Sequence, residues 1–232
     1  MAPSVAFVVP ALNEQENLEA AIEDITRALG TPAPAHRIYI FNDGSTDATG
    51  RVADGLAAKN KAVTVVHNER NMGLGYNYFR GVELAGEDYV MMVPGDAEIP
   101  EPAIRPILRE LGRADLVIPY MPDSAARPLS RRLVSSAFTQ FINVLFGQRI
   151  KYYNGPVLLR RDLVKGVGIR TQGFAYMAAI LVTLLKAGHS YVEVAIPLQY
   201  RRSGNSKAVT LKNITSVLRT IGELVRDVYF KR

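Results

Sequence analysis

Short apolar runs rich in β-branched residues recur along the first half of the chain, and amphipathic segments separate them. Continuous apolar runs of this length are typical of strands buried on both faces of a sheet. They predict strands at residues 5–9, 38–41, 63–66, 89–93 and 116–118. Apolar positions at helical spacing predict helices between them, one between Asn13 and Gly30 and the others at residues 47–58, 75–85 and 101–111. This alternation predicts a doubly wound α/β fold, with a mostly parallel central sheet flanked by helices.

The first of these helices has a start signal ahead of its apolar positions. Asn13 is followed three residues later by Glu16, which is the spacing of a capping box. Gly30 comes directly after the last apolar position, where a glycine commonly ends a helix. We therefore expect Asn13 to be the N-cap of this helix.

The second half of the chain has longer helical patterns and fewer strands. Amphipathic helices are expected at residues 129–147 and 207–232, and a buried helix at 174–187. Strands are expected at residues 156–160 and 191–200. Three prolines between residues 119 and 128 mark this stretch as the candidate linker between the two halves.

The two halves differ in charge. Residues 1–124 hold 10 Lys and Arg against 18 Asp and Glu, whereas residues 125–232 hold 18 against 4. An acidic half suits a divalent cation, and a basic half attracts phosphates, nucleic acid or an anionic membrane. The alternative is that the halves neutralise each other across a shared interface. No zinc-finger or RNA-recognition pattern is present, so nucleic acid is not an expected partner.

Several classes of protein are excluded by what the sequence lacks. The chain has no cysteine, which excludes disulfides, thiol catalysis, iron–sulfur clusters and cysteine-bound zinc. The glycine-rich dinucleotide fingerprint, the P-loop and the nucleophile elbow are also missing. The N-terminus has no basic stretch before its short apolar run, and residues 174–185 fall short of the ~20 apolar residues that span a bilayer. We therefore expect a cytoplasmic protein.

Acidic or amide residues follow each of the first four predicted strands. They are Asn13, Glu14, Asp43, Asn71, Asp96 and Glu98. Parallel strands direct their carboxyl ends to one edge of the sheet, and open α/β sheets bind ligands outside that edge. The sequence therefore predicts that these residues border one crevice.

The segment Asp96-Ala97-Glu98 is the sharpest candidate for metal binding. Carboxylates two residues apart can face one cation, and Ala97 between them is small enough for a tight bend. Hard oxygen ligands suit Mg²⁺ or Mn²⁺, which also bind substrate phosphates. For Asp43 two roles are open, either accepting a hydrogen bond from a nucleobase or capping the helix that follows.

Five segments hold most of these residues, in this order: Val8-Val9-Pro10-Ala11-Leu12-Asn13-Glu14, Asn42-Asp43-Gly44-Ser45-Thr46-Asp47, Asn71-Met72-Gly73-Leu74-Gly75, Pro94-Gly95-Asp96-Ala97-Glu98 and Tyr200-Arg201-Arg202-Ser203-Gly204-Asn205-Ser206-Lys207. Together they resemble the family 2 glycosyltransferases of GT-A fold, especially the dolichol-phosphate mannosyltransferase-like branch. The resemblance spans nearly the whole chain. It implies a Rossmann-like GT-A domain and an inverting transfer from a nucleoside-diphosphate sugar to a lipid phosphate.

The resemblance also implies roles for individual residues. Asp96 and Glu98 would be the catalytic metal site for Mg²⁺ or Mn²⁺. The residues expected to hold the nucleotide sugar are Pro10, Ala11, Asn13, Glu14, Asp43, Asn71 and Gly73. Glu98 departs from the family's usual Asp at the end of its metal motif, and residues 173–179 lack the acidic residue that many relatives have there.

The expected organisation is one catalytic domain over residues 1–232. Residues 1–118 would bind donor and metal, residues 119–206 the acceptor, and residues 207–232 would form a basic amphipathic helix. A phosphate acceptor is already an anion and needs positioning more than deprotonation. The groups expected on that phosphate are Arg131, Arg132, Arg201, Arg202, Lys207 and the hydroxyl of Ser206.

Some alternatives stay open at this point. The helices at 129–147 and 207–232 either lie on the inner face of an anionic membrane or pack on the core or on a second copy of the chain. A hydroxyl acceptor and a catalytically weak nucleotide-sugar-binding homologue are the alternative functions. A sugar-phosphate nucleotidyltransferase is disfavoured, because no glycine-rich basic loop follows the first strand.

Overall fold

One seven-stranded sheet forms the centre of the computed structural model. The structure describes residues 3–122, 129–167, 175–197 and 211–230, with backbone alone at 129–131, 211–214 and 216. The strand order is β3-β2-β1-β4-β6-β5-β7. Only β6 is antiparallel to its neighbours, so the expected mostly parallel sheet is confirmed. The strands are β1 (Val5–Ala11), β2 (His36–Asp43), β3 (Val63–Asn68), β4 (Tyr89–Met92), β5 (Leu116–Tyr120), β6 (Leu158–Arg160) and β7 (Tyr191–Ala195).

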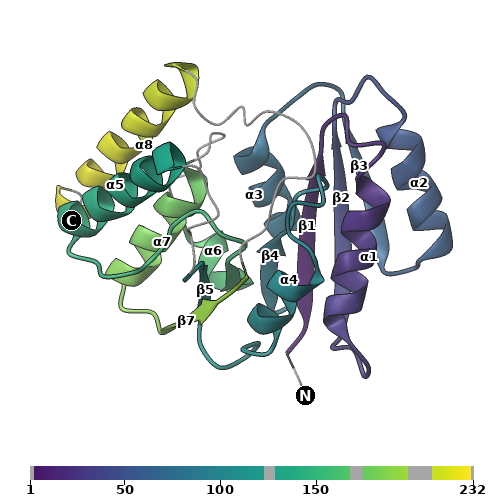
Figure 1. The fold of residues 1–232 in the computed structure, drawn as a ribbon, viewed down its shortest axis with the longest axis horizontal. Helices are drawn as coiled ribbons and strands as arrows, with labels where there is room; N and C mark the ends of the chain where they lie inside the picture. The colour runs from purple at the N-terminus through teal and green to yellow at the C-terminus, as the bar shows by residue number, and fades with distance from the viewer. Residues whose placement is uncertain (1–2, 123–128, 168–174, 198–210, 231–232) are drawn as a thin grey trace.

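Helices cover both faces of the sheet (Figure 1). One face is covered by α1 (Leu18–Leu29), α2 (Thr49–Lys59) and α4 (Glu101–Leu108). The other is covered by α3 (Leu74–Leu84), α5 (Leu129–Phe146), α6 (Arg161–Lys165), α7 (Tyr176–Lys186) and α8 (Leu211–Tyr229). No helix within the described ranges is both long enough and apolar enough to cross a bilayer.

The apolar runs of the sequence are explained by this double covering. In β1, Val5, Phe7 and Val9 point into the core beneath α1, α2 and α4. Ala6 and Val8 point into the opposite core, beneath α3 and α7. All five side chains are fully buried, because alternate residues of a strand face opposite sides of the sheet. A strand of this kind needs apolar residues at every position.

The proposed linker begins later than the prolines suggested. Pro119 and Tyr120 are part of β5, and Pro119 pairs with Val194 of β7. The Leu116 N–H donates to the Ser190 carbonyl, and the Tyr120 carbonyl accepts from the Ile196 N–H, so the backbone groups of these two residues face β7. Alternate residues of a strand direct these groups to opposite neighbours, so the nitrogen of Pro119 faces the β6 side. The pairing of β5 with β6 ends at Val117, before it reaches Pro119. The missing N–H therefore costs the sheet no hydrogen bond. Residues 123–128 lie outside the described part of the chain.

The remaining differences from the predicted elements are small. The short helix α6 was not expected, because five residues give too little periodicity to recognise. The direction of β6 was not predicted either, because an apolar run looks the same in a parallel strand and in an antiparallel strand. The last predicted strand ends at Ala195, and its residues 198–200 lie outside the described ranges.

Close packing of α3 on β1 depends on the absence of a side chain at Gly81. A Cβ atom there would overlap Val8 Cγ2 and lie 2.9 Å from Val8 Cγ1. Val8 is fully buried, and its β-branched side chain has little freedom to move away. The distance between helix and sheet is therefore set by this glycine.

We predict that Gly81→Ala lowers the free energy of unfolding by about 1–3 kcal/mol, because the added methyl overpacks the core. Gly55→Ala in α2 is the matched control. Nothing lies within 4 Å of the Cβ position there, so the change should be neutral or stabilise by about 0.5–1 kcal/mol. Urea unfolding of the two variants measures the difference, and equal stabilities would contradict this account of the packing.

Candidate functional site

The carboxyl ends of β1, β2, β3 and β4 lie next to one another at the upper edge of the sheet in Figure 1. Ala11 pairs with Asn42, and Asp43 pairs with Asn68, so the first three strands end in register. On the other side of β1, the Gly95 N–H donates to the Pro10 carbonyl at 2.9 Å. The loops that hold the predicted donor-site residues are thus neighbours, as the strand pattern predicted.

Side-chain hydrogen bonds join the loops after β1 and β2. The Asn13 N–H donates to Ser45 Oγ at 3.0 Å, and the Thr46 N–H donates to Asn13 Oδ1 at 2.9 Å. Asn13 has a φ of 58°, a left-handed conformation that asparagine tolerates better than most residues. The predicted capping box is therefore wrong. The helix α1 begins at Leu18 with Asn17 at its N-cap, and Asn13 ties together two loops instead.

The acidic residues of these loops are held by the same network. The Glu14 N–H donates to Thr49 Oγ1 at 2.8 Å, and Asn17 Nδ2 donates to Glu14 Oε2 at 2.8 Å. Burial raises the pKa of Asp47, but hydrogen bonds from Thr49 and from the Gln15 N–H outweigh it and lower that pKa. Pro10 and Ala11 are buried within β1, so they can border a ligand mainly through their backbone.

Asp43 is buried and its carboxylate is held by three hydrogen bonds. It is 4% exposed, and its carboxylate accepts hydrogen bonds from Asn68 Nδ2 at 2.8 Å, the Met72 N–H at 2.9 Å and the Gly73 N–H at 3.0 Å. Its side chain thus fixes the loop before α3. The alternative in which Asp43 caps α2 is wrong, because α2 has no side-chain cap.

Neighbouring glycines make this arrangement possible. Gly44 has a φ of 73°, and a Cβ there would lie 2.6 Å from Arg70 Cα, so only glycine fits. Gly73 has a φ of 90° at the start of α3, while Asn71 beside it is exposed. The loop before α3 therefore presents Asn71 outward while Asp43 holds its backbone from below.

Two residues of this network were missed by sequence reasoning. Asn68 Nδ2 donates to Asn77 Oδ1 at 2.7 Å as well as to Asp43, and Asn77 is completely buried in α3. A buried asparagine inside an amphipathic helix is uncommon enough to be the signal that could have identified Asn77. Together they extend the network from the strand end into α3.

The segment from Asp96 to Glu98 forms the predicted tight bend. The Glu98 N–H donates to Asp96 Oδ1 at 3.1 Å, and Ala97 has a φ of 53°. All three residues are half-buried. The described part of the chain holds no group of three His, Cys, Asp or Glu residues that could bind a metal. A pair of carboxylates fits Mg²⁺ or Mn²⁺, which commonly take one or two carboxylates and complete their shell with waters and substrate phosphates.

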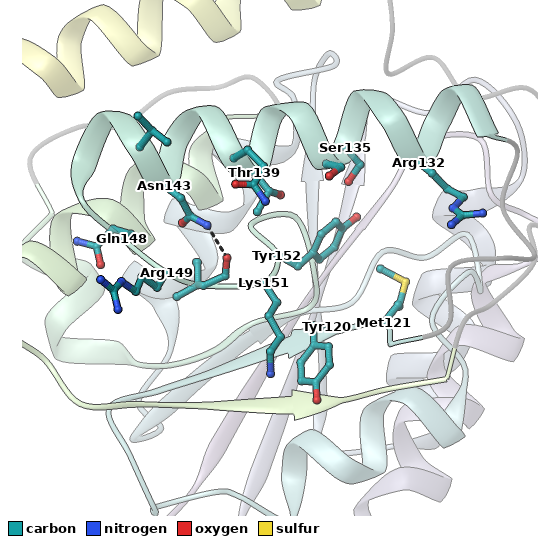
Figure 2. A pocket seen from close by; sticks show the side chains of 14 residues that line it. Tyr120, Met121, Arg132, Ser135, Thr139, Asn143, Gln148, Arg149, Lys151 and Tyr152 are labelled. Atoms are coloured by element: carbon teal, nitrogen blue, oxygen red, sulfur yellow. Dashed lines mark hydrogen bonds between the residues drawn. The ribbon is translucent and has the colours of Figure 1, made fainter.

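A groove of about 630 Å³ lies beneath α5 (Figure 2). The end of β5, the inner side of α5 and the loop after α5 line it. Because β6 is antiparallel to both β4 and β5, β5 runs in the same direction as β4 and ends at the same edge of the sheet. The lining residues are Tyr120, Met121, Arg132, Ser135, Ser136, Thr139, Gln140, Asn143, Val144, Gln148, Arg149, Ile150, Lys151 and Tyr152.

The groove is cationic. Its 14 lining residues include Arg132, Arg149 and Lys151 but no Asp or Glu. Lys151 Nζ lies 4.0 Å from the centre of the Tyr120 ring and 3.5 Å from Glu193 Oε2. Desolvation lowers the pKa of Lys151, but Glu193 and Tyr120 raise it by more, so the ammonium stays charged. Neither arginine forms an ion pair with a residue of the described ranges, which leaves both available to an anion.

Only part of the predicted acceptor set lies in this groove. Arg132 lines it, whereas Arg131 belongs to α5 but has no described side chain. Arg201, Arg202, Ser206 and Lys207 lie outside the described residues. Sequence reasoning did not identify Arg149 and Lys151, because only the groove beneath α5 brings them together with Arg132.

The chain matches the family model described as "Glycosyl transferase family 2" over residues 6–168. It is 30% identical over 216 residues to the polyprenol monophosphomannose synthase of Mycolicibacterium smegmatis, covering 86% of this chain and 79% of that protein. It is 25% identical over 214 residues to the undecaprenyl-phosphate mannosyltransferase of Micrococcus luteus, covering 88% and 86%.

Among solved structures, the fold is similar to glucosyl-3-phosphoglycerate synthase from Mycobacterium tuberculosis in complex with UDP. The TM-score is 0.71 at 16% identity, and the match covers 97% of this chain and 80% of that one. Other structures of that enzyme contain UDP with Mn²⁺ or with Mg²⁺. At this identity the likeness shows that the two chains share a fold.

We predict that Asp43→Asn loosens the loop before α3. The asparagine side chain is neutral, so its oxygen is a weaker acceptor than the carboxylate. Its NH2 group is a donor and cannot accept a hydrogen bond from a backbone N–H. The free energy of unfolding should therefore fall by about 1–3 kcal/mol. Hydrogen exchange should speed up at the Met72 and Gly73 amides. Asp24→Asn is the control, because Asp24 is equally buried but contacts α4; faster exchange of the two amides in that variant as well would contradict a local role for Asp43.

Proposed function

The chain belongs to glycosyl transferase family 2, and on that premise we propose that it transfers a sugar from a nucleoside-diphosphate sugar to a polyprenyl phosphate. One observation carries the proposal. A groove with three cations and no carboxylate lies at the same sheet edge as the acidic strand ends. The printed names of the two relatives above, a polyprenol monophosphomannose synthase and an undecaprenyl-phosphate mannosyltransferase, support the same acceptor class.

The donor would bind over the ends of β1 to β4. In this proposal Asp96 and Glu98 hold Mg²⁺ or Mn²⁺, which neutralises charge on the leaving diphosphate when bound. Asn13, Glu14 and Asn71 border the nucleotide, together with the backbone of Pro10, Ala11 and Gly73. Asp43 contributes by holding the loop that bears Asn71 and Gly73, since its carboxylate already accepts three hydrogen bonds.

The acceptor phosphate would lie in the groove beneath α5. Arg132 and Arg149 can each bind phosphate oxygens in a bidentate manner, and Lys151 adds a point charge. Hydroxyls of Ser135 and Thr139 line the same groove, as Figure 2 shows. Hydrogen bonds from the three cations would be charge-assisted, which suits a phosphate better than a neutral hydroxyl.

The reaction is then a single displacement. A phosphate oxygen of the acceptor forms a bond to the anomeric carbon while the bond from that carbon to the diphosphate breaks, and the configuration inverts. A phosphate is already ionised at neutral pH, so no general base is needed. Consistent with this, residues 175–182 at the start of α7 are buried and include no carboxylate.

We predict that Asp96→Asn lowers turnover about 100-fold or more, because loss of the cation removes several kcal/mol of charge stabilisation on the leaving group. The assay is transfer from labelled GDP-mannose and UDP-glucose to undecaprenyl phosphate, with Mg²⁺, with Mn²⁺ and with chelator. Asp54→Asn, an exposed carboxylate on α2, should retain wild-type turnover. Wild-type turnover of Asp96→Asn with either metal, or full activity in chelator, would refute the metal assignment.

A second prediction concerns the acceptor. Arg149→Ala should raise the KM for undecaprenyl phosphate about tenfold or more, the usual effect of removing a charged hydrogen-bond partner, and leave nucleotide affinity unchanged. Arg51→Ala, an exposed arginine on α2, serves as the matched control. An equal loss of affinity for the nucleotide would show that Arg149 does not act on the acceptor.

A further inference from the structure

A row of hydrogen bonds leads from the surface of α2 to the loop after β1. We call it the His67 network, and its members in order are Asp54, His67, Asn42, Ser45 and Asn13. His67 Nε2 lies 3.1 Å from Asp54 Oδ1, and His67 Nδ1 lies 3.0 Å from Asn42 Nδ2. The Ser45 N–H donates to Asn42 Oδ1 at 3.3 Å, and Ser45 Oγ accepts from the Asn13 N–H at 3.0 Å. The network thus joins an imidazole ring to a residue of the proposed donor site.

The topology places this network beneath α2. In the sheet that the described residues form, β3 is the edge strand, and its His67 lies beside Asn42 of β2. Asn42 points to the face that α2 covers, while Asp43, the next residue of β2, points to the opposite face. A Cβ atom at Gly50 of α2 would lie 2.9 Å from Asn42 Nδ2 and 3.6 Å from His67 Nδ1. The backbone of α2 therefore lies directly over the contact between the ring and the amide.

The hydrogen-bond partners assign the tautomer of the neutral ring. An ionised carboxylate only accepts hydrogen bonds, so the ring hydrogen is on Nε2, facing Asp54. Asn42 Oδ1 already accepts from the Ser45 N–H, so its NH2 group faces the ring. Nδ1 of His67 must then be the acceptor. One tautomer meets both requirements, which is how contacts at one ring nitrogen fix the role of the other.

A proton added to the ring would break this contact. Nδ1 would then carry a hydrogen and face the NH2 group of Asn42, which is also a donor. If the amide turned over to offer its oxygen to His67, its NH2 group would face the Ser45 N–H instead. One of the two hydrogen bonds of Asn42 is lost in either case. The loop at residues 44–47 would then be held less firmly against β2.

Nearby charges leave the ring free to gain and lose that proton. Asp54 is the one charged side chain among the described residues that contacts His67, and the side chains of the two are 62% and 47% exposed. The other charged residues of α2 are Arg51 and Lys59, and Glu69 follows β3. An ion pair as exposed as that of His67 with Asp54 contributes little. Histidine is the side chain whose charge ordinarily changes between about pH 5 and pH 8.

We propose that His67 is a positioning residue of the donor site. In its neutral form it orients Asn42, which holds the Ser45 loop and through it Asn13. This step deepens the proposed function, on which it rests, because Asn13 is among the residues proposed to border the nucleotide. Asn13 has a φ of 58°, and Ser45 and Thr46 both bind it in that left-handed conformation. Affinity for the donor should therefore fall as the pH falls.

The first test is calorimetric binding of UDP-glucose and GDP-mannose with Mg²⁺, at about pH 8 and about pH 5.5, on either side of the usual histidine range. The diphosphate of a sugar nucleotide is a diester and takes up no proton over this range. The wild-type affinity for whichever donor binds should be about three- to tenfold lower at the acidic pH, the usual effect of losing one hydrogen bond.

Two variants of one residue separate positioning from charge. His67→Gln keeps an oxygen that can accept from Asn42 and does not titrate, so its donor affinity should be near that of the wild type at alkaline pH and should not fall in acid. His67→Phe has a ring but no acceptor, so it should bind about three- to tenfold more weakly at both pH values. Turnover at saturating donor should be unchanged in both, because only donor binding depends on the loop.

His36→Gln is the matched control. His36 lies at the other end of β2, where its ring contacts the Pro34 carbonyl, so the variant should keep the wild-type pH profile. Asp54→Asn keeps an oxygen for the Nε2 hydrogen and should also behave as the wild type. A wild-type pH profile in His67→Gln, or wild-type affinity of His67→Phe at both pH values, would overturn the proposal.

Hydrogen exchange without any ligand keeps this inference separate from the proposed function. The protection factors of the Ser45 and Thr46 amides should be about three- to tenfold lower in His67→Phe than in the wild type and in His67→Gln. If they are lower but neither sugar nucleotide binds, His67 still holds the loop and the proposed function fails. If the wild type binds and transfers a sugar while all three chains exchange alike, the proposed function stands and the role of His67 is refuted.

Discussion

The buried carboxylate of Asp43 is the interaction on which the carboxyl edge of the sheet depends. It comes from the end of β2 and accepts the backbone N–H groups of Met72 and Gly73 from the loop that follows β3. An acceptor with a full charge forms stronger hydrogen bonds than a neutral one, and its burial means that water does not compete for them. The loop before α3 is thereby fixed against the sheet, and Asn71 is presented at the surface.

A second constraint brings the acidic and cationic regions to one edge. The strand β6 is inserted in the opposite direction between β4 and β5, so that β5 again runs parallel to the first four strands. Its end at Tyr120 therefore lies at the same edge as the ends of β1 to β4. In the proposed reaction this topology brings an activated sugar and an anionic acceptor together, although they bind to different halves of the chain.

The charge division of the chain is consistent with that arrangement. Carboxylates follow the strands of the first half, where a divalent cation would neutralise their charge and that of a donor's diphosphate. Cations line the groove in the second half, where no carboxylate is among the lining residues. Opposite charges kept apart in this way can each attract their own ligand, which a surface of mixed charges would do less well.

Much of the fold was predictable, because its strands are buried on both faces. Such strands must be apolar at every position, and this pattern located β1 to β5 and the helices between them. The candidate site was predictable to the same extent. Parallel strands send their ends to one edge, so Asn13, Glu14, Asp43 and Asp96 could be placed near one another from their positions after the strands.

Other features depended on contacts between distant residues. Asn13 has the sequence position of a capping-box residue, but in the structure its backbone N–H donates to Ser45 and its side-chain oxygen accepts from the Thr46 N–H instead. Arg149 and Lys151 became candidates only when α5 was seen to lie over them. The sequence by itself determined which segments are strands, which are helices and which strand ends bear carboxylates, since these follow from local periodicity. Only the tertiary structure decided the direction of β6, the partners of Asp43 and the groove beneath α5. Each of these features arises where segments far apart in the chain compete for the same hydrogen bonds and the same buried space.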